Sequence, residues 1–135
     1  MNATSQDIAS LLEGDSSGSG LGLTYAVNLF IGKEPSKPND CTTIFDTGGM
    51  PPQMNLTDQG YEFPSIQIRV RSSDYLTGWD MIEAIKTFLH GRGQETIDGT
   101  FYSAISCASG PAFLDWDENS RARFVVNFSI QRRTN

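Results

Sequence analysis

The 135-residue sequence has few cysteines and histidines, which limits the chemistry available to it. One histidine, no CxxC pair and no Cys/His cluster leave little material for a zinc site or a Ser/His triad, so we expect no cofactor. Cys41 and Cys107 are most simply small, buried or half-buried side chains, although a disulfide or a reactive thiol is the alternative. We expect His90 at a helix C-terminus, where an imidazole interacts favourably with the helix dipole.

The sequence also lacks a basic excess and long apolar runs. No segment approaches the roughly 20 apolar residues that cross a bilayer, and the start does not resemble a secretion signal, so no membrane contact is expected. Ten basic residues against 16 acidic ones give a net charge of −6, which disfavours tight nucleic-acid binding. A chain of this length with 38% hydrophobic residues predicts one domain, residues 1–135.

Two amphipathic segments predict helices. Residues 4–13 have Thr4 or Ser5 as a possible N-cap and apolar side chains at helical spacing. Residues 75–90 form the longer segment, which follows a Ser-Ser-Asp cap and ends at a glycine. The region 1–22 joins the first helix to a Gly/Ser-rich connection, so that helix could dock on its own sheet or reach a neighbouring subunit.

Alternating apolar and polar residues predict the strands. Between residues 121 and 131, for example, Phe124, Val126, Phe128 and Ile130 would share one buried face. The predicted fold class is α+β: a two-layer sandwich with a mainly antiparallel sheet packed by one long helix plus a short N-terminal helix. The predicted strands are 25–31, 41–46, 65–71, 101–108, 112–116 and 121–131, with the first two and the last two paired as hairpins.

The triplet Asp46-Thr47-Gly48 follows two apolar residues, as in aspartic proteases. A retroviral-type dimeric protease would bring together one such carboxylate from each of two subunits. However, Pro51 and Pro52 follow, and prolines disfavour the strand that continues there in such enzymes. The simpler interpretation is that Asp46 accepts hydrogen bonds from the backbone amides that follow it in a turn, and the dimeric protease is kept as an alternative.

Two regions are predicted to contact other subunits or partners. The first is the long loop from Met50 to Phe63, because long loops in compact domains are usually functional; packing on the domain's own core is the alternative. The second is the hairpin tip around residues 113–118. The arginines of the 65–71 strand would form a solvated or intersubunit ion-pairing face. The candidate contact residues are Asp46, Met50, Pro51, Pro52, Met54, Tyr61, Phe63, Arg69, Arg71, Phe113 and Trp116.

Four segments in this order and spacing resemble the bacteriophage minor capsid family that includes the tail terminator proteins of long-tailed phages. The resemblance extends from about Ile8 to Arg132, but the Gly/Ser-rich connection and the polar tail, residues 132–135, are unmatched. The four segments are residues 44–49 with the Pro-Pro loop, residues 62–71, the 75–90 helix and residues 123–128.

The resemblance implies a non-enzymatic virion subunit that assembles in the host cytoplasm as a ring, typically hexameric, at the head-proximal end of the tail tube. The ring would stop tube polymerisation and contact the tail tube protein and the neck or head-completion connector protein. DNA would pass through the lumen without tight binding, and Asp115, Asp117 and Glu118 could face it and repel the phosphates. A different head–tail joining protein, an adaptor or a stopper, is a further alternative.

Overall fold

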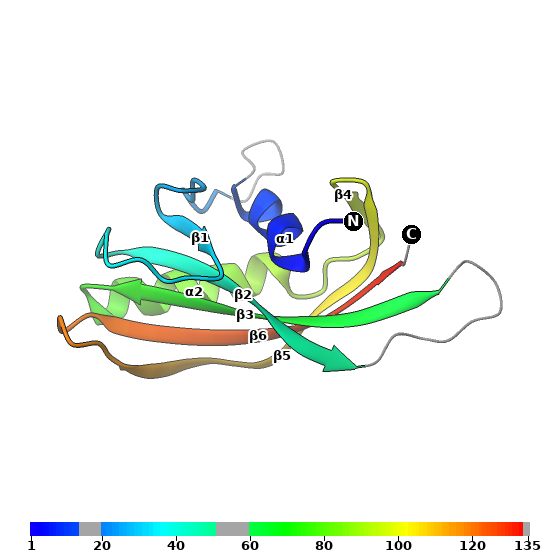
Figure 1. Ribbon diagram of the computed structural model, residues 1–135. Coiled ribbons are helices and arrows are strands. Elements are labelled where there is room, and N and C mark those ends of the chain that lie inside the picture. The colour runs from blue at the N-terminus through cyan, green and yellow to red at the C-terminus, as the bar shows by residue number, and fades with distance from the viewer. Residues whose placement is uncertain (14–19, 51–59, 134–135) are drawn as a thin grey trace.

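The computed structural model describes residues 1–13, 20–50 and 60–133 (Figure 1). In these residues, six strands form one sheet with the order β1-β2-β3-β6-β5-β4. β1 and β2 are parallel, and the other neighbouring strands are antiparallel. The elements are α1 (Thr4–Glu13), β1 (Leu29–Ile31), β2 (Cys41–Met50), β3 (Tyr61–Ser72), α2 (Tyr75–Leu89), β4 (Glu95–Ile97), β5 (Thr100–Trp116) and β6 (Ala122–Arg133).

The predicted fold class is wrong, because the protein is mostly β and its sheet is not a flat layer under one long helix. The sheet curls into a half-barrel, and the two helices have only 10 and 15 residues. Both helices pack on the inner face: α1 contacts β1 to β4, and α2 contacts β3, β5 and β6. α1 fits between the two edge strands (Figure 1), so the curl of the sheet is what gives the short helix a place to bury.

The irregular strand β5 accounts for much of this curl. The sequence predicts a break at residues 109–111, but β5 continues through them, and its register against β6 shifts at four places. Such bulges increase the local twist and bend a strand. At Gly110 the φ angle is 87° and a Cβ atom would lie 2.8 Å from the Val125 carbonyl oxygen, so glycine is needed where the bulged strand approaches its neighbour.

The predicted hairpin of residues 25–31 and 41–46 is also wrong. Only Leu29–Ile31 forms a strand, and it runs parallel to β2. The connecting residues therefore return along the sheet instead of forming a tight turn. Arg71 holds this connection in place, because its guanidinium group donates hydrogen bonds to the carbonyl oxygens of Pro35, Pro38 and Asn39.

Several local predictions are confirmed. α2 has Asp74 as its N-cap, which accepts a hydrogen bond from the Thr77 amide, and His90 as its C-cap. The apolar residues 124, 126, 128 and 130 of β6 are all buried. β5 and β6 form the predicted hairpin across the Asp117–Ser120 turn. Cys41 is buried, Cys107 is half-buried and neither forms a disulfide.

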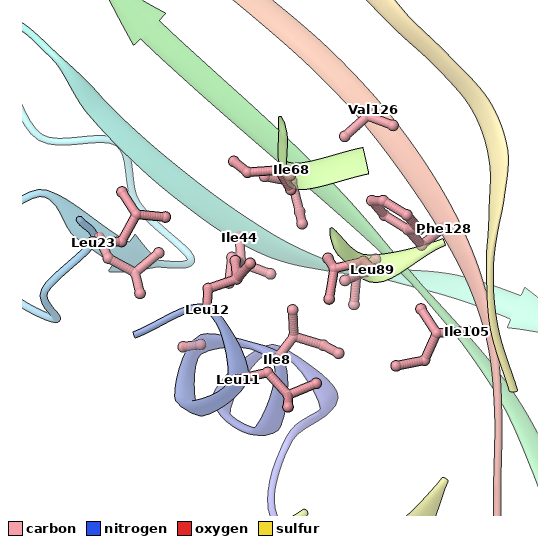
Figure 2. Close-up of a cluster of buried hydrophobic side chains, with 14 of the residues drawn as sticks. Ile8, Leu11, Leu12, Leu23, Ile44, Ile68, Leu89, Ile105, Val126 and Phe128 are labelled. Carbon is pink, nitrogen blue, oxygen red and sulfur yellow. The ribbon is translucent and has the colours of Figure 1, made fainter. Parts of the chain in front are cut away.

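The core lies between the helices and the inner face of the sheet (Figure 2). Leu12 of α1 points toward Ile44 of β2, Ile8 of α1 points into the same cluster, and Leu89 of α2 lies near Phe128 of β6. These side chains are fully buried, so one apolar cluster joins both helices to the sheet. In the described ranges no helix is long and apolar enough to cross a membrane.

Candidate assembly surfaces

Asp46 lies on β2, where its carboxylate holds the first turn of α1. Its Oδ1 accepts a hydrogen bond from the Ser5 amide at 2.9 Å, and its Oδ2 accepts one from the Ser5 hydroxyl at 2.6 Å. Amides in the first turn of a helix have no intrahelical partner and attract negative charge. The predicted turn role of Asp46 is therefore wrong: the side chain caps a helix that lies 41 residues earlier in the sequence.

The structure contains a buried polar cluster beside α1 that the sequence did not predict. Asp7 and Tyr102 are both fully buried, and the Tyr102 hydroxyl donates a hydrogen bond to Asp7 Oδ2. Arg132 Nη1 donates to the Tyr102 hydroxyl at 3.2 Å and Arg132 also pairs with Glu62. Burial, and then the hydrogen bond to Asp7, raise the pKa of Tyr102, so its hydroxyl remains a proton donor. Asp7 and Tyr102 are 95 positions apart in the sequence, so no local sequence signal indicates this contact.

The end of the β2–β3 pair forms the first exposed apolar surface. Met50 is 73% exposed and lies opposite Phe63 across the strand pair. On the neighbouring strands, the Arg133 guanidinium lies 4.8 Å from the Phe101 ring centre and 5.9 Å from that of Tyr61. We call Met50, Tyr61, Phe63, Phe101 and Arg133 the arm surface. The candidate residues Pro51, Pro52 and Met54 lie outside the described residues.

A hollow of about 210 Å³ adjoins the arm surface. Met50 and Phe63 contribute large apolar side chains to it, and the other lining residues come from β2, β3, β5 and β6. We call this site the hollow. Its lining includes Met50, Phe63, Ser65, Ala104, Ser106 and Ser129.

The second exposed apolar surface lies at the opposite end of the sheet, where the β5–β6 hairpin meets the start of α2 (Figure 1). The Tyr75 ring centre lies 5.4 Å from that of Phe113 and 6.2 Å from that of Trp116. Tyr75 and Phe113 also pack on the buried Phe124, so the exposed rings have a rigid base. We call the exposed members the aromatic patch: Tyr75, Leu76, Phe113, Leu114 and Trp116.

The candidate arginines of β3 do not join either surface. Arg71 is only 3% exposed and binds the residue 34–39 connection, including Glu34 at 3.3 Å. Arg69 is half-buried, lies 5.1 Å from the Phe45 ring centre and donates a hydrogen bond to Gln67. Both side chains therefore bind groups of their own chain: Arg71 binds the connection, and Arg69 binds residues of the sheet.

Two of the three acidic residues proposed for a lumen are already paired. Asp115 forms two hydrogen bonds with Arg123, at 2.6 and 2.7 Å, and these hold the pKa of Asp115 below its usual value. Asp117 pairs with Arg121 at 2.8 Å. Glu118 is exposed and makes no ion pair within the described part of the chain. The negative electrostatic potential at this end of the molecule is thus weaker than three unpaired carboxylates would produce.

The fold defines a small, mostly β protein with two exposed apolar surfaces at opposite ends of one curled sheet. The described residues contain no group of three or more His, Cys, Asp or Glu side chains that could hold a metal ion. A profile of the family described as bacteriophage tail terminator protein matches residues 8–134. The chain belongs to this family, which confirms the resemblance drawn from the sequence.

A similar structure comes from a virion of the native gene transfer agent particle. It is 11% identical in sequence, and the match covers 98% of this chain and 96% of the other with a TM-score of 0.69. At this identity the likeness shows a shared fold. No curated protein sequence matches the chain.

Proposed function

We propose that this tail protein forms a ring, most simply of six copies, at the head-proximal end of the tail tube. There it stops tube polymerisation and joins the tail to the neck or head-completion connector. The observation that carries the proposal is the family match over residues 8–134, which spans the second half of α1, the whole of α2 and the six strands of the described residues. The whole chain, residues 1–135, would act as one domain in the neck of the virion.

The proposed role is structural rather than enzymatic. A dimeric aspartic protease needs two carboxylates that share a proton across a subunit interface. Here the Asp46 carboxylate accepts two hydrogen bonds from Ser5 of its own chain, and α1 lies next to it. The geometry therefore favours a capping role for Asp46 over a catalytic one.

The proposed partners are further copies of the chain, the tail tube protein and the connector protein, while DNA passes through the ring without tight binding. The net charge of −6 supports weak interaction with DNA. Because Asp115 and Asp117 are paired with arginines, the proposed weak interaction with DNA rests on the net charge of the chain and not on these two carboxylates.

Loss of the chain during particle assembly tests this function. We expect tubes of uncontrolled length and heads without tails, seen by electron microscopy, and rescue by the wild-type chain and by Asp46→Asn. Tails of normal length that join heads in its absence would overturn the proposal.

The position of the chain separates a terminator from an adaptor or a stopper. Antibody labelling of separated heads and tails should place a terminator on the ends of free tails. Labelling found only on heads would instead indicate a head-bound adaptor or stopper.

A further inference from the structure

We propose that Trp116 of one copy inserts into the hollow of the next copy, and that this knob-and-hole contact closes the ring. The inference rests on the proposed function, because it names the partner surface that a ring of identical subunits would use. Its occupant is a second copy of this chain.

Trp116 has the properties of an interface anchor. Its side chain is 53% exposed at the end of β5, yet Tyr75 and Phe113 hold the indole from one side. A rigid, exposed aromatic side chain loses little conformational freedom on binding and can bury a large area. Tryptophan is accordingly enriched among the residues that dominate protein–protein binding.

The hollow suits one large side chain better than a small-molecule ligand. Its volume of about 210 Å³ is below the roughly 300–1,000 Å³ of typical ligand pockets. Met50 and Phe63 offer apolar contacts, and Ser65, Ser106 and Ser129 add hydroxyl groups to the lining. An indole matches this mixed lining, because it combines an apolar ring with one N–H donor.

The two sites cannot meet within one copy. Trp116 stands ten positions beyond Ser106 on the same strand, which corresponds to roughly 30 Å at about 3.3 Å per residue. A contact between them must therefore be between copies, with different surfaces used on each side. Such a heterologous contact closes a ring when the rotation between copies is a whole fraction of a turn.

The charges beside the two sites are complementary. Glu118, two residues after Trp116, is exposed and lacks an ion pair within the described residues. Arg133, which lies on the Phe101 ring in the arm surface, likewise lacks an acidic partner there. Docking the knob in the hollow would bring one unpaired carboxylate toward one unpaired guanidinium group, which favours this contact.

Two variants remove the two halves of the contact separately. Trp116→Ala removes the knob and keeps the hollow, while Ser106→Trp fills the hollow from an exposed position and keeps the knob. Val27→Ala and Ala108→Trp are the matched controls, because both positions are exposed and neither contributes to the aromatic patch or the hollow.

The masses are measured by light scattering and analytical ultracentrifugation, with the wild type also examined on tube ends by electron microscopy. We expect the wild type and both controls to form rings. Each single variant should be monomeric with an unchanged circular dichroism spectrum. Their equimolar mixture should form a dimer and nothing larger, because one intact knob and one intact hollow remain.

Rings formed by either single variant, or a mixture that stays monomeric, would overturn the knob-and-hole contact and leave the proposed function standing. Absence of wild-type rings both in solution and on tubes would overturn the proposed function together with the inference. In a second test, Glu118→Arg and Arg133→Glu should each weaken the ring, and the double variant should restore it. Failure of the double variant to restore it would contradict the proposed orientation.

Discussion

The two helices lie on the same face of the sheet but are held there in different ways. α2 buries an apolar stripe of Ile82, Ile85 and Leu89, with Gly78 close to Phe124. α1 is shorter and buries polar as well as apolar side chains, among them Ser5 and Asp7. Apolar packing and a cap from the preceding residue therefore hold the longer helix, whereas the shorter one also depends on hydrogen bonds to distant residues.

This difference has a physical basis in helix length. An isolated helix of 10 residues is marginal in water, because the first turn costs conformational entropy that few hydrogen bonds offset. The capping carboxylate of Asp46 and the buried Tyr102 hydroxyl supply α1 with distant partners, whereas the capping carboxylate of α2, Asp74, directly precedes that helix in the sequence. The comparison predicts that removing polar contacts will lower the free energy of unfolding far more when the contacts hold α1 than when they hold α2.

The largest expected effect is the loss of apolar packing under α2. Ile82→Ala should lower the free energy of unfolding by about 2–5 kcal/mol, because the side chain is fully buried and a cavity would remain. Urea denaturation monitored by circular dichroism measures this change. The loss should be similar at 50 mM and 500 mM salt; a strongly salt-dependent loss would contradict a purely apolar attachment of α2.

Loss of the hydroxyl group that Asp7 depends on should have the next largest effect. Tyr102→Phe should cost about 1–3 kcal/mol in urea unfolding, because a buried carboxylate loses a hydrogen-bond donor. The cost should be much smaller when Asp7→Asn is already present, and this double-mutant cycle gives the coupling. Equal costs in both backgrounds would show that the hydroxyl does not act through Asp7.

Alkaline pH should weaken the attachment of α1 through the same hydroxyl. The folded state raises the pKa of Tyr102, so the stability that this tyrosine contributes is fully present below its unfolded pKa of about 10 and is lost as the pH rises toward the folded pKa. The loss should reach about 1.4 kcal/mol for each pH unit above that value. Above pH 10, the stability difference between the wild type and Tyr102→Phe should therefore narrow, and a constant difference would contradict the raised pKa.

The smallest expected effect is the loss of the cap on α1. Asp46→Ala should cost about 1 kcal/mol, the usual value for removing a helix-capping side chain. Asp46→Asn keeps an acceptor oxygen and should cost less. Hydrogen exchange of the Ser5 amide gives a local measure, and unchanged protection in Asp46→Ala would show that the carboxylate does not hold the first turn.

The sequence predicted those elements that local interactions specify. The N-cap Asp74 and the helical spacing indicated α2, and the alternation along β6 indicated its buried face. The curl of the sheet could not be predicted in this way, because it arises from bulges in β5 that depend on pairing with β6. The parallel pairing of β1 was missed because the path of the intervening connection involves contacts with the distant Arg71, which no local pattern indicates.

The candidate surfaces were predicted in part. Met50, Tyr61 and Phe63 were identified as one region and Phe113 and Trp116 as another. The structure places each set together, with Met50, Phe113 and Trp116 exposed and with Tyr61 and Phe63 half-buried. Whether other subunits bind there stays a prediction. Tyr75 and Arg133, which complete the two surfaces, come from other elements, so no sequence spacing links them to these sets.

The sequence by itself determined the second helix and the apolar alternation of the sheet, because these depend on residues close together in the chain, and it determined the family through the order and spacing of four segments. Only the tertiary structure decided the half-barrel, the capping role of Asp46 and the buried pair of Asp7 and Tyr102. The physical reason is distance along the chain: such contacts join residues tens of positions apart, and they exist only after the sheet has curled around α1.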